Sequence, residues 1–292
     1  MLPQLIMNSL IAGCVYALVG VGFGLIYSSM RFFHLAHGIV FTAGPYLAFF
    51  LAERGGLPHP VALLLAVVLS ALLGIAMEIC VYRRLRRRTA SPLVLLLASL
   101  GLYVVLQNVI SVVFGDNVQT LRWWLTDEGI SLAGARITLI QITTVCATAA
   151  LAFALSVFLK ITQMGRAIRA VADDPELAEV SGIGSDGVVL CAFAIGSGLA
   201  GVAGVLFALD VDMTPTMGMN VLMLGVVAAI IGGIGSIPGT VLGAILLGLA
   251  QNLGVWHLST QWQDAIAFVV LLAFLLLKPQ GLLGKKLKKA VV

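Results

Sequence analysis

Few residues in this chain could carry out chemistry. The strings that mark zinc proteases (HExxH), serine hydrolases (GxSxG) and nucleotide-binding loops (GxxxxGKS/T) do not occur in it. Glu78 falls within an apolar stretch and Asp264 at the outer end of another, and we interpret both as boundary residues. Proton-coupled pumps place charged groups deep in their spans, and this chain offers almost none. The residues therefore predict no catalytic, cofactor or metal site, and no means of hydrolysing ATP in this chain.

The most informative polar stretch is the segment 161–185, ITQMGRAIRAVADDPELAEVSGIGS. Its first half has the pattern of a helix, and Pro175 biases Asp174 away from the helical region. Asp174 suits an N-cap, Pro175 suits the first helical position, and Glu176 complements the helix dipole. Gly182 can end this second helix. The pattern predicts two short helices joined at a capped corner.

The surface of this segment has two interpretations. Gly165, Arg166 and Ala170 allow close packing along the first helix, and Leu177 and Val180 form a small apolar face on the second. A solvated run of charges is one interpretation. The other is a docking surface for a partner, and the well-specified local fold favours it.

Two apolar stretches carry residues that interrupt a helix. The first is RFFHLAHGIVFTAGP at 31–45, in which His34, His37, Gly38, Gly44 and Pro45 fall inside a nominal span. The second is GGIGSIPG at 232–239. Irregular backbone at membrane depth is tolerated where protein or a water-filled cavity surrounds it. Paired broken segments can mark a transport site between inverted repeats. For His37 alone, a structural role is favoured over contact with a solute.

The elements that position these residues are membrane helices. The 292 residues are 60% hydrophobic and 10% charged, and the mean hydropathy is +1.09. Soluble globular chains carry roughly a quarter charged residues. A membrane helix needs about 20 mainly apolar residues, and the chain offers about eight or nine such runs. We expect them near 4–29, 33–52, 60–82, 91–114, 138–160, 186–209, 220–235, 238–255 and 264–278. The predicted fold is an all-α, polytopic bundle with some spans broken or re-entrant, forming a single domain over 1–292.

Basic residues set the expected orientation. The strings RRLRRR at 83–88 and KKLKK at 285–289 each flank an apolar span. If 83–88 is cytoplasmic, alternation places 161–185 and the C-terminus inside and 115–137 outside. All but three of the 17 Lys and Arg residues then face the cytoplasm, the exceptions being Arg54, Arg122 and Arg136. Trp123 and Trp124 of the outer segment suit the headgroup level or an extracytoplasmic partner.

The remaining composition excludes other classes of protein. The four cysteines form no CxxC pair and lie in apolar stretches, so they indicate neither a metal site nor a disulfide framework. The net charge of +4 comes from basic clusters beside spans. Such clusters favour contact with anionic lipid headgroups, and we expect no binding to nucleic acid.

Several strings match a known family. HLAHG at 34–38 is similar to the N(F/L)AHG motif of branched-chain amino acid ABC transporter permeases, with His34 where asparagine is usual. GGIGSIPGTVLGAILLG at 232–248 and KPQGLLG at 278–284 are similar to two further strings of that family, and 165–183 resembles its cytoplasmic coupling loop. The chain thus resembles the LivH type of permease.

This resemblance implies a membrane-spanning subunit of an ATP-driven importer in the cell inner membrane, which moves branched-chain amino acids or a related small polar solute by alternating access. It implies two cytoplasmic ATPase subunits, a second permease subunit (LivM type, or a second copy in a homodimer) and an extracytoplasmic solute-binding protein. ATP would be used by the partner subunits. A self-contained channel or secondary transporter is the alternative, although it would need intramembrane charges that this sequence largely lacks.

The resemblance also implies roles for particular residues. The coupling loop, about 161–185, would dock on the ATPases through Gly165, Arg166, Arg169, Ala170, Asp173, Asp174, Pro175, Glu176, Glu179 and Gly182. The candidates for the translocation path are His34, His37, Gly38, Gly232, Gly233, Gly235 and Ser236.

Overall fold

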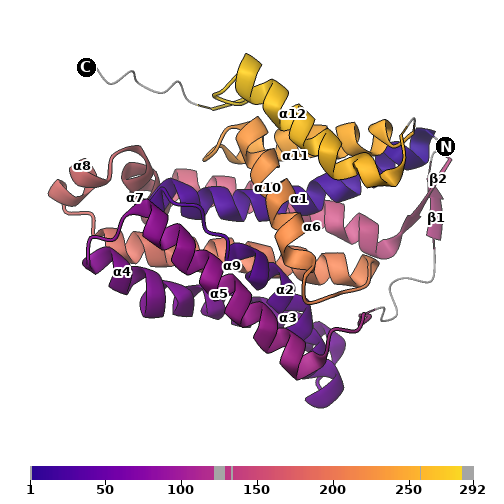
Figure 1. The fold of residues 1–292 in the computed structure, drawn as a ribbon, viewed down its shortest axis with the longest axis horizontal. Helices are drawn as coiled ribbons and strands as arrows, with labels where there is room; N and C mark the ends of the chain where they lie inside the picture. The colour runs from indigo at the N-terminus through magenta and orange to yellow at the C-terminus, as the bar shows by residue number, and fades with distance from the viewer. Residues whose placement is uncertain (1, 122–128, 133, 257, 285–292) are drawn as a thin grey trace.

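A computed structural model describes residues 2–121, 129–132, 134–256 and 258–284 of the chain as a bundle of long helices (Figure 1). The Lys-rich string at 285–289 and the residues Arg122, Trp123 and Trp124 lie outside this described part. The helices are α1 (Leu2–Met30), α2 (His37–Phe49), α3 (His59–Met77), α4 (Arg83–Arg87), α5 (Pro92–Phe114), α6 (Leu139–Ile161), α7 (Gln163–Asp173), α8 (Pro175–Val180), α9 (Ser185–Asp210), α10 (Met217–Gly232), α11 (Ile237–Gly254) and α12 (Gln263–Leu277). The remaining elements are two π-helical turns, η1 (Phe50–Arg54) and η2 (Glu78–Tyr82), a 3-10 turn, η3 (Thr260–Trp262), and the strands β1 (Gly129–Leu132) and β2 (Ala135–Thr138).

The predicted all-α, polytopic architecture is confirmed. Among the described residues, seven helical stretches are long and apolar enough to cross a membrane. They are Leu2–Met30, His59–Arg87, Pro92–Phe114, Leu139–Ile161, Ser185–Asp210, Ile237–Gly254 and Thr260–Leu277. The other two expected spans are helices as well, but α10 has 16 residues and α2 has 13. Each is short because it begins or ends at one of the two predicted breaks. Helix α2 starts only at His37, and α10 stops at Gly232.

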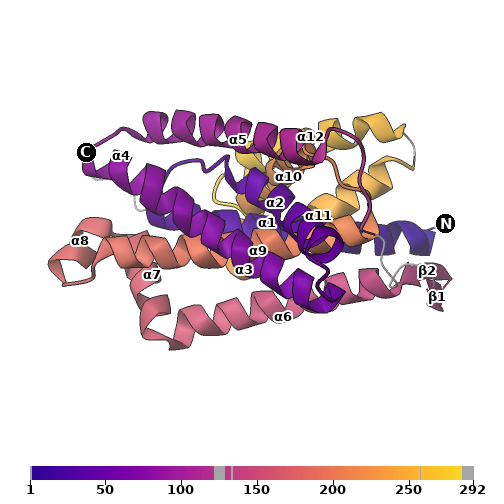
Figure 2. The same cartoon turned by 90° about the horizontal axis from the view of Figure 1, so that it is seen from below.

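The helix α1 is the centre of the bundle, since it is buried along most of its length and packs against α6, α9, α10 and α11. By contrast, α5 buries only Leu95, Ser99, Tyr103 and Ile110, so most of its apolar surface faces outward. Figure 2 shows α5 and α6 on opposite sides of the bundle. The arrangement is that of a buried axis surrounded by helices that present apolar side chains to lipid.

The bundle has two distinct ends. One end, here called the α8 end, carries α4, α7 and α8, and the other carries the start of α1 and the β1–β2 hairpin (Figures 1 and 2). The hairpin pairs Gly129 with Thr138 and Leu132 with Ala135 in antiparallel register. It begins within the outer segment 115–137, for which we predicted no strand. Its four-residue strands are too short to produce a clear alternating pattern.

The first predicted break is confirmed in place but not in extent. Helix α1 ends at Met30, and residues 31–36 are not helical. The expected interruption at Gly44 and Pro45 is wrong, because both lie inside α2. Pro45 cannot donate to the carbonyl of Phe41, and Gly204 of α9 lies so close that a Cβ there would be 1.9 Å from this oxygen. The neighbouring helix therefore covers the backbone that the proline leaves unpaired.

Close helix contacts through glycine predict a sharp local sensitivity. A Cβ at Gly22 of α1 would lie 2.7 Å from the carbonyl oxygen of Gly196 on α9 and 3.1 Å from Nε2 of His37. We expect Gly22→Val to lower the unfolding free energy by about 1–3 kcal/mol, the usual cost of overpacking. Thermal unfolding of the detergent-solubilised protein measures this effect. Gly101→Val on α5 is the control, since a Cβ there meets nothing within 4 Å. Equal melting temperatures for the two variants would contradict the packing of α1 on α9.

Candidate functional site

Segment 161–185 folds as the sequence predicted. The hydroxyl of Thr162 accepts a hydrogen bond from the Gly165 N–H (2.9 Å) and starts α7, and the Asp174 carboxylate accepts one from the Leu177 N–H (3.0 Å) and starts α8. Pro175 is the first residue of α8. Gly182 follows α8 with a φ of +82°, a conformation that glycine adopts without strain. The two helices thus meet at a corner that is fixed by hydrogen bonds.

The predicted docking residues of this segment fall into two groups. Gly165 is buried where α7 turns away from α6, and a Cβ there would lie 2.3 Å from the carbonyl oxygen of Phe158. Ala170 is half-buried, and Arg166 donates to the Ile161 carbonyl (2.8 Å) at the end of α6. Gly165 and Arg166 therefore hold the turn between α6 and α7 in place. The exposed group is Arg169, Asp173, Asp174, Pro175, Glu176, Glu179 and Gly182, together with Arg166, which is exposed although it makes this contact.

Two strongly exposed apolar side chains of the segment lie on α8. Leu177 is 63% exposed and Val180 is 87% exposed, whereas Ala178 between them is buried. Glu176 and Glu179 flank these two residues and are exposed as well. Apolar side chains surrounded by charge on an exposed, capped helix are typical of a surface that a partner covers.

An arginine that sequence reasoning used only for orientation anchors this segment to the bundle. Arg31 follows α1 with a φ of +54°, and its guanidinium donates to the carbonyl oxygens of Ala172 (2.9 Å) and Asp173 (3.4 Å) at the end of α7. A cation at a helix C-terminus satisfies otherwise unpaired carbonyls and opposes the helix dipole. Arg31, three residues before His34, thus binds the C-terminal end of α7.

The first group of candidate path residues is buried. His34 and His37 are fully buried, with ring centroids 5.9 Å apart, and Nδ1 of His34 lies 3.1 Å from the Tyr82 hydroxyl and 3.3 Å from the Ser99 hydroxyl. Ser99 also accepts a hydrogen bond from the Ala36 N–H (2.8 Å). In this conformation the pair is part of a packed polar core at the start of α2.

The second group forms the turn between α10 and α11. Gly233 and Gly235 have φ values of +101° and +85°, and the Ser236 hydroxyl accepts from the Gly239 N–H (3.2 Å) to start α11. The string at 278–284 lies against this turn, because Leu282 and Leu283 donate their backbone N–H groups to the last carbonyls of α10. The strings at 232–248 and 278–284 are therefore in direct contact.

The structure does not bring the two groups of path candidates together. His37 lies beside Gly22 of α1, while Gly235 lies beside Gly24, whose added Cβ would be 3.7 Å from the Gly235 nitrogen. Residues two apart on a helix point to different sides. Helix α1 therefore lies between the two broken segments, and they do not form one site in this conformation.

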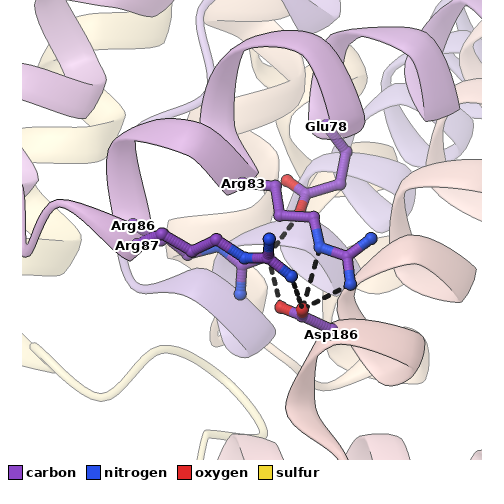
Figure 3. Close-up of polar contacts among 5 residues, drawn as sticks. All are labelled: Glu78, Arg83, Arg86, Arg87 and Asp186. Carbon is purple, nitrogen blue, oxygen red and sulfur yellow. Dashed lines mark hydrogen bonds and ion pairs between the residues drawn. The ribbon is translucent and has the colours of Figure 1, made fainter.

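Sequence reasoning missed a cluster of charges at the α8 end, here called the arginine–carboxylate cluster (Figure 3). Its members are Glu78, Arg83, Arg86, Arg87 and Asp186. We interpreted Glu78 as a boundary residue, but it is 1% exposed and pairs with Arg86. Asp186 at the start of α9 lies within 2.6 Å of Arg83 and 3.3 Å of Arg86. The sequence offered only a weak sign of this cluster, a single acid at the start of an expected span on the same side as 83–88.

Comparison with known proteins gives the geometry its context. The family model described as branched-chain amino acid transport system / permease component matches residues 5–275. The chain belongs to this permease family. The match runs from α1 to α12 and includes both broken segments and segment 161–185.

Individual relatives agree with the family. This permease is 32% identical to the high-affinity branched-chain amino acid transport system permease protein LivH of Escherichia coli, over 97% of this chain and 95% of the relative. It is also 32% identical to the corresponding protein BraD of Pseudomonas aeruginosa, with the same coverage. The solved structure of PsaBC from Streptococcus pneumoniae in complex with Fab has a similar fold, with a TM-score of 0.52 at 14% identity over 96% of this chain and 97% of that one.

The capped corner predicts a local effect on α8. We expect Asp174→Ala to destabilise α8 by about 1 kcal/mol, because it removes the side chain that accepts from the Leu177 N–H. Hydrogen exchange of residues 175–181 should become faster by roughly fivefold, with the spans unchanged. Glu179→Ala, on the exposed face of the same helix, should leave exchange unaltered. Equal exchange in both variants would contradict the capping role.

Proposed function

We propose that this permease is the membrane-spanning subunit of an ATP-driven importer for branched-chain amino acids. The observation that carries the proposal is the exposed, hydrogen-bonded pair of helices α7 and α8, in a chain that matches the permease family along nearly its whole length. The names of its relatives in Escherichia coli and Pseudomonas aeruginosa supply the class of solute. This chain supplies no catalytic site of its own and binds no cofactor, and ATP is used by partner subunits.

The proposed assembly follows from the two ends of the bundle. Two ATPase subunits bind at the α8 end, which faces the cytoplasm together with the C-terminus. A solute-binding protein binds at the end that carries the β1–β2 hairpin. A second permease subunit, of the LivM type or a second copy of this chain, completes the pore. This arrangement keeps the arginines of 83–88 on the cytoplasmic side, as the distribution of basic residues in membrane proteins requires.

The proposed mechanism is alternating access. When ATP draws the two ATPases together, they displace α7 and α8, and the bundle changes from inward-facing to outward-facing. Such a shift requires that each partner bind one state better than the other. The broken segments that contain His34, His37 and Gly38, and Gly232, Gly233, Gly235 and Ser236, are the places where helices can change direction. We propose that they shape the walls of the path on either side of α1.

Reconstitution tests the function directly. The complex that is recovered with the tagged chain is placed in proteoliposomes with its solute-binding protein and radiolabelled leucine. We expect leucine uptake that requires ATP on the ATPase side and stops when ATP is replaced by a non-hydrolysable analogue. Uptake by the chain alone without ATP would contradict the proposal and favour a channel or secondary transporter.

The docking face makes a second prediction. Leu177→Asp combined with Val180→Asp should weaken ATPase binding at least tenfold, because burying one such side chain contributes about 1.5–3 kcal/mol and 1.4 kcal/mol is tenfold. Co-purification of the ATPases at increasing dilution measures this loss. Val118→Asp is the matched control. Val118 is 62% exposed and follows the end of α5 that lies away from α8. Unchanged ATPase binding in the double variant would show that α8 is not the docking face.

A further inference from the structure

Asp186 lies close to the proposed docking helix along the chain. It is the second residue of α9, and only residues 181–184 separate α8 from that helix. This connection is held by hydrogen bonds, because the Gly182 N–H donates to the Glu179 carbonyl (2.9 Å) and the Ile183 N–H donates to the Ala178 carbonyl (3.0 Å). A short, hydrogen-bonded connection transmits displacement, so movement of α8 also moves the first turn of α9.

The Asp186 carboxylate holds one face of α4. Its Oδ2 lies 2.8 Å from Nε of Arg83 and 3.5 Å from a terminal nitrogen of Arg87, and its Oδ1 lies 3.3 Å from a terminal nitrogen of Arg86. Positions 83, 86 and 87 have the i, i+3, i+4 spacing of one helix face. Arg84 points elsewhere and is exposed. Figure 3 shows the three guanidinium groups gathered around this single carboxylate.

Arg86 extends the cluster into the bundle. It also pairs with Glu78, which is 1% exposed and belongs to the π-helical turn η2. Separating this pair would leave the buried Glu78 carboxylate without its partner, which is unfavourable, so we expect Glu78 and Arg86 to move together. In the part of the chain that the structure describes, Glu78 Oε2 and Arg86 Nε make no hydrogen bond.

The same π-helical turn reaches the broken segment before α2. Tyr82 is buried four residues after Glu78, and its hydroxyl lies 3.1 Å from Nδ1 of His34. Its ring also packs against Phe193 of α9, with centroids 5.5 Å apart. π-Helical turns inside long helices are frequent at functional sites. A continuous set of contacts thus joins the start of α9 to the His34 segment.

We propose that Asp186 is a positioning residue for transport, and that its carboxylate transmits the displacement of α8 to the helix formed by α3, η2 and α4. Glu78 and Tyr82 then pass this displacement to the His34 segment. The inference rests on the proposed function, since it needs ATPases that displace α8. Asp186 contacts neither solute nor nucleotide in this account. Its effect is on how much solute moves for each ATP that is hydrolysed.

The test compares variants of the whole complex in proteoliposomes, with leucine uptake and ATP hydrolysis measured on the same vesicles. We expect Asp186→Asn to assemble with its partners and to lower leucine uptake per ATP by roughly fivefold or more, the lower end of typical coupling between linked sites. Asp186→Glu, which keeps the charge, should retain most of the wild-type ratio. Arg84→Gln is the control, because Arg84 lies on the same short helix but has no ion pair in the cluster.

A second variant separates transmission from simple destabilisation. Arg83→Gln leaves the pair of Glu78 and Arg86 in place and should also lower uptake per ATP. Combining it with Asp186→Asn should add little to either single change, since directly interacting residues are non-additive. A purely structural role would instead reduce the yield of complex and lower uptake and hydrolysis in proportion.

The outcomes distinguish this inference from the proposed function. If the wild-type complex shows ATP-driven uptake and Asp186→Asn has the wild-type ratio of uptake to hydrolysis, the role of Asp186 is refuted while the importer function stands. If the wild-type complex shows no ATP-driven uptake of leucine, the proposed function itself fails. A proportional loss of uptake and hydrolysis in Asp186→Asn would also overturn the inference.

Discussion

Backbone groups cannot be left unpaired inside a membrane, and this constraint explains much of the bundle. Two helices that could have crossed without interruption are broken instead, before His37 and after Gly232. At the first break, Ser99 of α5 accepts from the Ala36 N–H, and the His37 N–H donates to the His34 carbonyl. One hydrogen bond of this break is thus made to another helix and one within the segment itself.

The second break explains a feature of the C-terminal region. The last carbonyls of α10 have no helical donor, because the chain turns at Gly233. The backbone N–H groups of Leu282 and Leu283 donate to the carbonyls of Ile231 and Gly232, at 2.8 and 2.9 Å. The turn after α12 thus completes the end of α10. This accounts for the presence of GGIGSIPG and KPQGLLG together in one sequence.

Two residues, Arg31 and Asp186, link the α8 end to the bundle, and both links reach the broken segment that contains His34. Arg31 holds the last carbonyls of α7 and lies three residues before His34, and Asp186 holds α4, whose helix reaches His34 through Tyr82. The exposed helices α7 and α8 are therefore attached on both sides to the first broken segment. That arrangement suits a part that converts movement at a docking surface into a change within the spans.

The parts that the sequence could predict depend on local chemistry. Membrane spans follow from apolar length, and the corner at Asp174 and Pro175 follows from capping preferences, so both were predicted at nearly the right residues. Positions that depend on distant contacts were harder to predict. Pro45 lies inside a helix where Gly204 of another helix covers the Phe41 carbonyl, and Glu78 is buried beside Arg86, which pairs with it.

The candidate site shows the same division. Segment 161–185 was recognised from its own residues, but its division into buried and exposed groups depends on α6 and on Arg31. The separation of the two broken segments by α1 could not be predicted, since it results from helix packing between residues far apart in the chain. Asp186 was missed because its partners lie about a hundred residues earlier, and a single acid at the start of a span has no distinctive pattern.

The most direct test of the account is to recover the tagged chain from its native membrane in mild detergent and to identify by mass spectrometry the proteins that accompany it. An importer subunit predicts recovery of ATPase subunits together with a second multi-span protein or a second copy of this chain. Recovery of the chain as a single subunit, with no ATPase under conditions that preserve other membrane complexes, would contradict the account.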